Sequence, residues 1–200
     1  MTSSPIAENA LRQLFKLANR WMLLLWRLEL GNFGNRPETS QVMVLTHTGR
    51  KSGLRRRTPV NYTVIDDAIY CTAGFGSTAD WYKNIIADPH VEVWLRDGWW
   101  AGLAEEVADD DPQRLHVMRQ VLIASGFAAP LFAGMNPKTI DDGALAQATA
   151  SYRLIRIRRN EARTGPGGPG DLAWLWPAAT FVLLGLLLRR RRTGCLAKPL

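Results

Sequence analysis

Residues 58–73 read TPVNYTVIDDAIYCTA, two runs rich in β-branched and aromatic residues on either side of a pair of aspartates. Asp tolerates the positive φ of a tight turn, so this pattern predicts a β-hairpin. A second hairpin is expected at residues 90–107, where HVEVWL and WWAGLAEEV flank an Arg-Asp-Gly turn. Consecutive hairpins favour a small antiparallel barrel over a doubly wound parallel sheet.

The same signals continue on both sides of these hairpins. QVMVLTH (41–47) and SYRLIRIRR (151–159) have the length and composition of strands, which brings the expected number to about six, mostly antiparallel. ADWYKNIIADP (79–89) predicts a short helix. DDPQRLHVMRQVLIAS (110–125) predicts a second one, with Asp110 or Asp111 as its N-cap and Pro112 in its first turn. The expected class is α+β, mainly β, with helical insertions.

Both ends of the chain differ from the middle. We expect an N-terminal amphipathic helix within residues 1–35, a barrel over 36–160 and a Gly/Pro linker over 161–171. Residues 172–188 carry no charge and precede four arginines, so 172–192 is interpreted as a C-terminal hydrophobic helix and membrane anchor with a basic end. The alternatives are an interfacial helix, or a tail buried on the domain. We therefore expect anionic lipid as a partner and the cytoplasmic face of the cell membrane as the location, peripheral or anchored at the C-terminus.

The basic charge is unevenly distributed. The formal charge is +7, and residues 151–200 hold ten Lys and Arg against two acidic residues, which leaves the first 150 residues near −1. A nucleic-acid partner is not expected, because the excess belongs to the tail and not to the folded body. The three isolated histidines and two separate cysteines show no metal-ligand spacing, so no metal is expected.

Two loops have the composition of ligand-binding loops. LTHTGRKSGLRRRTP (45–59) concentrates five Lys and Arg around two glycines, which suits an anion with several charges, although a solvated basic turn is the alternative. AGFGSTADWYKN (73–84) matches Gly-x-Gly-x-x-Ala, the dinucleotide fingerprint. The strand before it is expected in a hairpin, so a glycine loop forming a second anion site with the following helix is the simpler interpretation.

Together these two loops resemble the deazaflavin (F420)-dependent nitroreductase family. The likeness lies in TxTGRKSG followed by RTP, then a glycine loop, then DWYKNI and ADP, and it extends over about residues 8–158. The resemblance implies a split β-barrel of the FMN-binding type that uses coenzyme F420, with FMN as the alternative cofactor because this fold supports both.

The resemblance also implies which residues bind the cofactor. Arg50, Lys51, Ser52 and Arg56 would hold its acidic phosphate and glutamyl tail, and Thr58 and Pro59 would lie along the ring system. The opposite wall would consist of Ala73, Gly74, Phe75, Gly76, Ser77, Trp81 and Asn84.

Two features depart from the family pattern. His47 stands where the family commonly has a small hydroxyl residue, and residues 125–137 contain Phe127 and Phe132 but no tyrosine. Phenylalanine cannot donate a proton, so these two residues predict an apolar substrate pocket, and the catalytic residues stay unassigned.

The expected function is thus a membrane-associated F420H2-dependent reductase of nitroreductase or quinone reductase type. It would transfer hydride from reduced F420 to an apolar electrophile such as a quinone, an enone or a nitro compound. The alternatives are an FMN-dependent reductase and a non-enzymatic membrane-surface or anion-binding module. A homodimer is also expected to be possible, since split barrels often pair through exposed strand edges.

Overall fold

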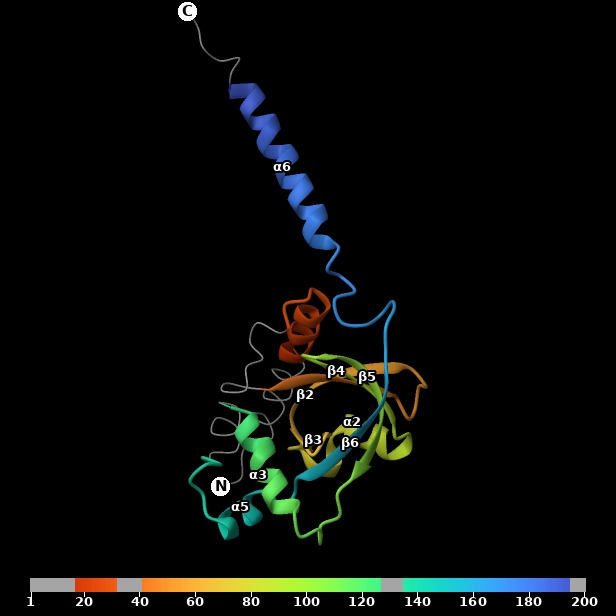
Figure 1. Cartoon of the computed structure of the whole chain (residues 1–200), viewed down its shortest axis with the longest axis vertical. Coiled ribbons are helices and arrows are strands. Elements are labelled where there is room, and N and C mark those ends of the chain that lie inside the picture. Colours follow the sequence, from red (N-terminus) through yellow and green to blue (C-terminus); the bar gives the residue numbers. More distant parts are fainter. Residues whose placement is uncertain (1–16, 32–40, 127–134, 195–200) are drawn as a thin grey trace, which may run out of the picture.

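The computed structural model describes residues 17–31, 41–126 and 135–194. Six strands form a closed barrel in the order β1-β2-β3-β6-β5-β4, and every neighbouring pair is antiparallel (Figure 1). This confirms the expected antiparallel barrel with helices. The strands are β1 (Val42–Thr48), β2 (Arg55–Ile65), β3 (Ala68–Ala73), β4 (His90–Leu95), β5 (Gly98–Glu106) and β6 (Arg153–Ala162). Besides an N-terminal helix, the described part of the chain contains η1 (Gly76–Thr78, a 3-10 turn), α2 (Asp80–Ala87), α3 (Arg114–Ala124), α5 (Asp142–Ala148) and α6 (Leu175–Gly194).

Both predicted hairpins form at the expected turns. Asp66 and Asp67 adopt φ of 49° and 62°, the left-handed conformation that a two-residue hairpin turn between β2 and β3 requires. β4 and β5 pair from Leu95 opposite Gly98 to His90 opposite Leu103, so the Asp-Gly turn also lies where it was predicted.

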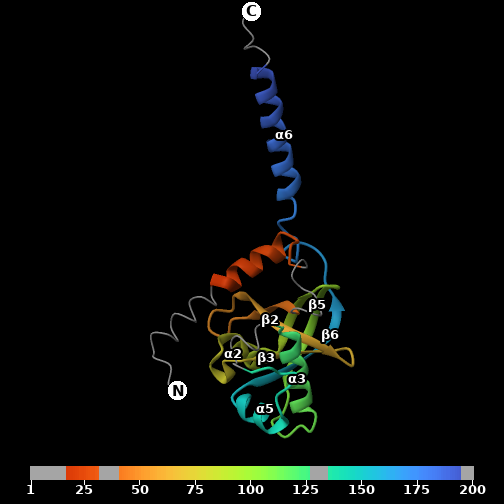
Figure 2. The ribbon, with the colours of Figure 1, turned by 90° about the vertical axis from the view of Figure 1, so that its left-hand side faces the viewer.

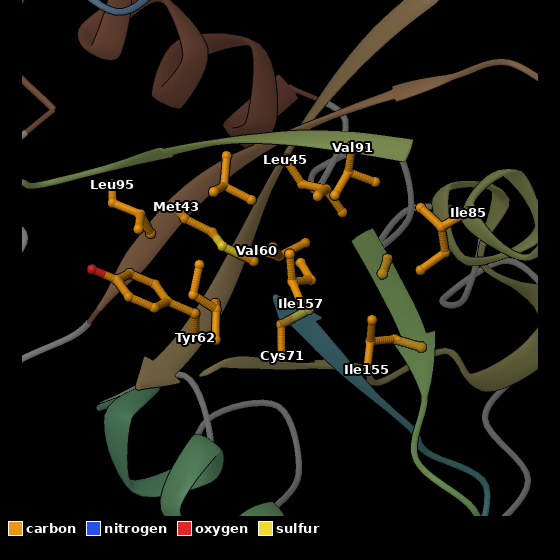
Figure 3. Close-up of a cluster of buried hydrophobic side chains, with 13 residues drawn as sticks. Met43, Leu45, Val60, Tyr62, Cys71, Ile85, Val91, Leu95, Ile155 and Ile157 are labelled. Atoms are coloured by element: carbon orange, nitrogen blue, oxygen red, sulfur yellow. The ribbon is translucent and has the colours of Figure 1, made fainter. Parts of the chain in front are cut away.

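The barrel interior is a closely packed apolar core. Side chains from the strands and from Ile85 of α2 point toward one another inside it (Figure 3). Met43, Leu45 and Ile157 are completely buried. Burial raises the pKa of the Cys71 thiol to about 12, so this cysteine is an apolar packing residue rather than a nucleophile.

A second core lies under α3 and α5. Met118, Val121 and Leu122 of α3 are buried against Leu145 of α5 and Leu154 of β6. α3 begins at Arg114, later than the predicted caps imply, and Asp111 instead accepts a hydrogen bond from the Gln113 amide in the turn before it. α5 was not predicted, although Asp141 caps it by accepting from the Ala144 amide, a signal visible in the sequence.

A third core fixes the N-terminal helix, which the structure describes over residues 17–27. Trp26 packs with Val44 and Trp94 on the outer surface of the barrel. The helix lies along the outer wall of the barrel, beside the start of α6 (Figure 2). It therefore buries part of its apolar face on the folded domain.

The Gly/Pro segment before α6 also packs on the barrel and on this helix. Arg27 donates two hydrogen bonds to the Asp171 carboxylate, at 2.8 and 3.1 Å, and the Leu172 amide donates to the Arg27 carbonyl. A Cβ on Gly168 would lie 2.6 Å from the Trp99 ring, so only glycine permits this close approach. The base of α6 is thus attached to the domain at several points.

α6 extends away from the barrel (Figure 1). It begins at Leu175, three residues into the apolar run that starts at Leu172. Within the described ranges, no helix combines the length and apolarity needed to cross a membrane.

Candidate functional site

The β1–β2 loop is a compact turn with a cationic tip. Its backbone is fixed by hydrogen bonds from the amides of Ser52 and Gly53 to the Gly49 carbonyl and from the Gly49 amide to the Leu54 carbonyl. Gly53 has a φ of +65°, which favours glycine at this position. Residues 50–56 are exposed, so the turn presents its side chains to solvent.

The five cations around this loop have different roles. Arg55 pairs with Glu92 of β4, and Arg57 stacks over the Trp94 ring at 4.6 Å and donates to the Gly167 carbonyl. Arg50 pairs with Asp80 of α2 at 3.2 Å. Lys51 makes no hydrogen bond or ion pair within the described residues, and Arg56 donates only to the Ser52 hydroxyl, at 3.4 Å. Lys51 and Arg56 are therefore the cations that this arrangement leaves for an anionic ligand.

Arg50 joins the loop to α2. Its backbone amide and its Nη1 both donate to Oδ1 of Asn84, at 3.2 and 2.8 Å, and Nη1 also donates to the Asp80 carbonyl. The two sequence motifs predicted to face each other are thus in direct contact. The position of Arg50 in this contact differs from the tail-binding role that the resemblance implies, because its guanidinium is already held by α2.

A buried polar chain lies beneath this contact. Asn84 Nδ2 lies 3.2 Å from Nδ1 of His47, and His47 Nε2 lies 3.2 Å from the Thr58 hydroxyl. His47 and Asn84 are each 3% exposed. Burial lowers the pKa of His47 to about 4, aided by the charge of Arg56 and opposed by a hydrogen bond involving the Thr48 backbone. Sequence reasoning gave His47 no role, because one histidine at the end of a strand carries no local signal.

Thr58 and Pro59 point to opposite sides of β2. Val60 and Tyr62 face the barrel core, so alternation along the strand places Thr58 on the same side, next to His47. Pro59 lies opposite Val44, which belongs to the outer cluster. Only Thr58 of this predicted pair therefore belongs to the polar chain.

The glycine loop is pressed against the start of β6. Gly76 has a φ of +56°, and a Cβ there would lie 2.3 Å from the Ser151 carbonyl oxygen. Gly74 faces the half-buried ring of Tyr152, and Phe75 is 45% exposed. Ala73 is buried at the end of β3, and Ser77 is exposed in η1. This geometry explains Gly76 by close packing and backbone conformation, without a dinucleotide fingerprint.

Trp81 lies on α2 and packs against the barrel core from outside. Tyr82, beside it, donates to Glu106 at 2.7 Å. Trp81 therefore takes part in the packing of the core. Phe127 and Phe132, the predicted pocket residues, lie outside the described residues.

A cavity of about 310 Å³ adjoins the buried polar chain, among residues of β1, β4, β5 and the end of β6, and His47 and Arg55 contribute to its lining. Thr46, Glu92 and Gly102 contribute to its lining, and none of the predicted cofactor residues does. The candidate site rests instead on the converging motifs: the cationic tip of the β1–β2 loop, Asn84 at the centre, and the glycine loop that precedes α2.

The fold and the candidate site together define a class of protein. It is a six-stranded antiparallel barrel in which a donor-rich cationic loop contacts a short helix that follows a glycine loop. The family model for F420H(2)-dependent quinone reductases matches residues 20–128, more than half of the chain. The chain belongs to this family. It is an F420H2-dependent reductase, and its cofactor is coenzyme F420.

Two solved structures that match the chain are at most 23% identical to it in sequence. The conserved hypothetical protein Rv2991 from Mycobacterium tuberculosis is 23% identical, with 63% of this chain and 77% of that one covered and a TM-score of 0.45. An F420-H2 dependent reductase (FDR-A) is 20% identical over 62% of this chain and 95% of that one, with a TM-score of 0.43. No curated protein matches the chain.

Proposed function

We propose that the protein transfers hydride from reduced F420 to an apolar electrophile, with a quinone as the first choice and an enone or nitro compound as further candidates. The observation that carries this proposal is the contact of the β1–β2 loop with α2 through Arg50 and Asn84. It brings together the two motifs on which the resemblance rests.

The residues present suit the chemistry of the cofactor. F420 carries a phosphate and several carboxylates, and Lys51 and Arg56 offer exposed cationic donors beside the Ser52 hydroxyl. Lys51, Ser52 and Arg56 would hold the acidic tail, while Thr58 and the glycine loop would flank the ring. The reduced deazaflavin supplies the hydride, and the protein supplies orientation and electrostatics.

We also propose attachment to anionic lipid at the cytoplasmic face of the membrane. Seven apolar residues of α6 between Phe181 and Leu188 are more than half exposed. Successive residues of a helix are about 100° apart, so these side chains cover its whole circumference, and one protein groove could not bury them all. Trp174 and Trp176 at the base of α6 have the amphipathic character of interfacial anchors. A homodimer stays a prediction.

The central experiment measures cofactor binding and turnover separately. Purified full-length protein is titrated with F420 by fluorescence, and the reduced cofactor is then mixed with menadione while its absorbance is followed. We expect micromolar or tighter binding and oxidation that depends on the protein. The absence of binding would refute the site, whereas binding without menadione-dependent oxidation would refute the quinone. A parallel FMN titration should show weaker binding.

Replacement of single lysines tests the cationic tip. Lys51→Ala should weaken F420 binding roughly three- to tenfold, because an exposed charge pair contributes on the order of 1 kcal/mol. Lys138→Ala removes the same charge at an exposed position near α5 and serves as the control. Equal affinities of the two variants would exclude Lys51 from the site.

A further inference from the structure

The orientation of the Asn84 amide is fixed by Arg50. The Arg50 backbone amide and Nη1 can only donate hydrogen bonds, and both lie within 3.2 Å of the same Asn84 atom. That atom must be the carbonyl oxygen, Oδ1. Asn84 Nδ2 therefore faces His47, at 3.2 Å from Nδ1.

This orientation determines where the His47 ring carries its proton. Nδ2 of an amide is a donor only, so Nδ1 of His47 accepts at the Asn84 contact, and the ring also has the Thr48 backbone as a hydrogen-bond partner. A neutral imidazole then has its hydrogen on Nε2. The ring is 3% exposed, and burial keeps it neutral at ordinary pH.

The proton on Nε2 in turn orients the Thr58 hydroxyl. Nε2 lies 3.2 Å from Thr58 Oγ1, so Thr58 accepts from His47. The hydroxyl has one hydrogen of its own, which must point away from His47. His47 is the only hydrogen-bond partner of this hydroxyl within the described residues, and Thr58 is half-buried at the barrel end next to the cationic loop.

We propose that His47 is a positioning residue: the chain Arg50–Asn84–His47 holds the Thr58 hydroxyl as a hydrogen-bond donor to a carbonyl oxygen of the bound ligand. The proposal rests on the proposed function, since the ligand is either the deazaflavin ring or the quinone. It assigns a role to His47, a residue at which the chain departs from the family it resembles.

The first test reads the proton position directly and needs no ligand. Imidazole nitrogen shifts of the ¹⁵N-labelled full-length protein are recorded at pH 7. The exposed histidines His90 and His116 are removed one at a time by His→Gln variants to assign the signals. We expect a neutral His47 ring with hydrogen on Nε2. Hydrogen on Nδ1, or on both nitrogens, would overturn the proposal.

The second test replaces the hydrogen-bond donor that faces His47 by an acceptor. Asn84→Asp keeps the oxygen that Arg50 contacts and replaces the donor with an acceptor, so the proton should move to Nδ1 or the ring should become doubly protonated. An unchanged Nε2 tautomer in a folded Asn84→Asp variant would show that Asn84 does not determine which His47 nitrogen carries the hydrogen.

The third test measures what Thr58 does for the ligand. Thr58→Val should weaken F420 binding about five- to tenfold if the acceptor oxygen belongs to the cofactor, as expected for one neutral hydrogen bond. It should raise KM for menadione by a similar factor, with F420 affinity unchanged, if the oxygen belongs to the quinone. Thr58→Ser, which keeps the hydroxyl, is the matched control. If neither constant changes, Thr58 donates to no ligand and the proposal fails.

A double-mutant cycle separates positioning from a structural role. If His47 acts through Thr58, His47→Gln should weaken the affected constant in the wild-type background and change it little in the Thr58→Val background. Additive effects would contradict the coupling. Failure of the wild type to bind F420 would refute the proposed function and the ligand role of Thr58, while the first two tests would still decide the His47 tautomer.

Discussion

At the scale of single residues, the site depends on a histidine that is kept neutral inside the barrel. His47 has an amide donor on one side and a hydroxyl on the other, and a doubly protonated ring would place two donors against each other at Asn84. Because the buried ring resists protonation, His47 makes the free energy of unfolding depend on pH.

We expect the free energy of unfolding to fall as the pH is lowered from about 6.5 to about 4. The unfolded chain takes up a proton on His47 near pH 6.5, whereas the native state resists protonation until about pH 4. The unfolded state thus binds more protons in this window, and the loss can reach about 3 kcal/mol. Urea titrations at several pH values measure it. His47→Gln should flatten this part of the profile; a profile unchanged by the substitution would place the dependence elsewhere.

Glycine substitutions test two positions with the same backbone conformation. Gly76→Ala should destabilise the fold by more than about 2 kcal/mol, because its φ of +56° is unfavourable for alanine and its Cβ would collide with the Ser151 carbonyl. Gly53→Ala has a φ of +65° but nothing within 4 Å, so it should cost only about 1 kcal/mol. Equal losses in chemical unfolding would show that the contact with Ser151 is unimportant.

At the scale of elements, the site is formed where the β1–β2 hairpin loop meets α2. Neither element carries it alone: the loop supplies Lys51 and Arg56, and α2 supplies the Asn84 side chain that fixes Arg50. The other loop cations are used within the fold, two of them by the outer face of the barrel. The cationic cluster is therefore divided between cations used within the fold and cations left for the proposed ligand.

The ion pair between Arg50 and Asp80 provides a test at this scale. Asp80→Asn should leave the fold intact, since Asp80 is exposed, but should loosen the loop and weaken F420 binding about two- to fivefold. Asp142→Asn, at an exposed ion pair with Arg119 on the far helices, is the matched control. Fluorescence titration compares them, and the same affinity in both would show that the loop needs no attachment through Asp80.

At the scale of the whole molecule, the N-terminal helix and the segment before α6 hold each other on the barrel. Besides the Arg27–Asp171 pair, the Trp176 indole donates to the Leu28 carbonyl at 3.0 Å. These contacts fix the point from which α6 leaves the domain (Figure 2). Any attachment through α6 would also orient the barrel.

A chain ending at Pro177 keeps these contacts and removes the exposed apolar part of α6. We expect it to bind F420 like the full chain but to lose cosedimentation with phosphatidylglycerol-containing vesicles. The full chain should bind such vesicles more strongly than vesicles of phosphatidylcholine alone. Equal vesicle binding by both chains would refute a role for α6 in lipid attachment.

The sequence alone determined the barrel and the two motifs that meet at the candidate site. Asp66-Asp67 and Asp97-Gly98 favour tight turns whatever surrounds them, and strand periodicity is a local property, so the hairpins could be predicted. The tertiary structure decided which of the five loop cations remain for a ligand and what His47 does. Those outcomes depend on partners 30 or more residues away, such as Asn84 for His47 and Glu92 for Arg55. Burial and hydrogen-bond direction exist only once the strands have closed into a barrel.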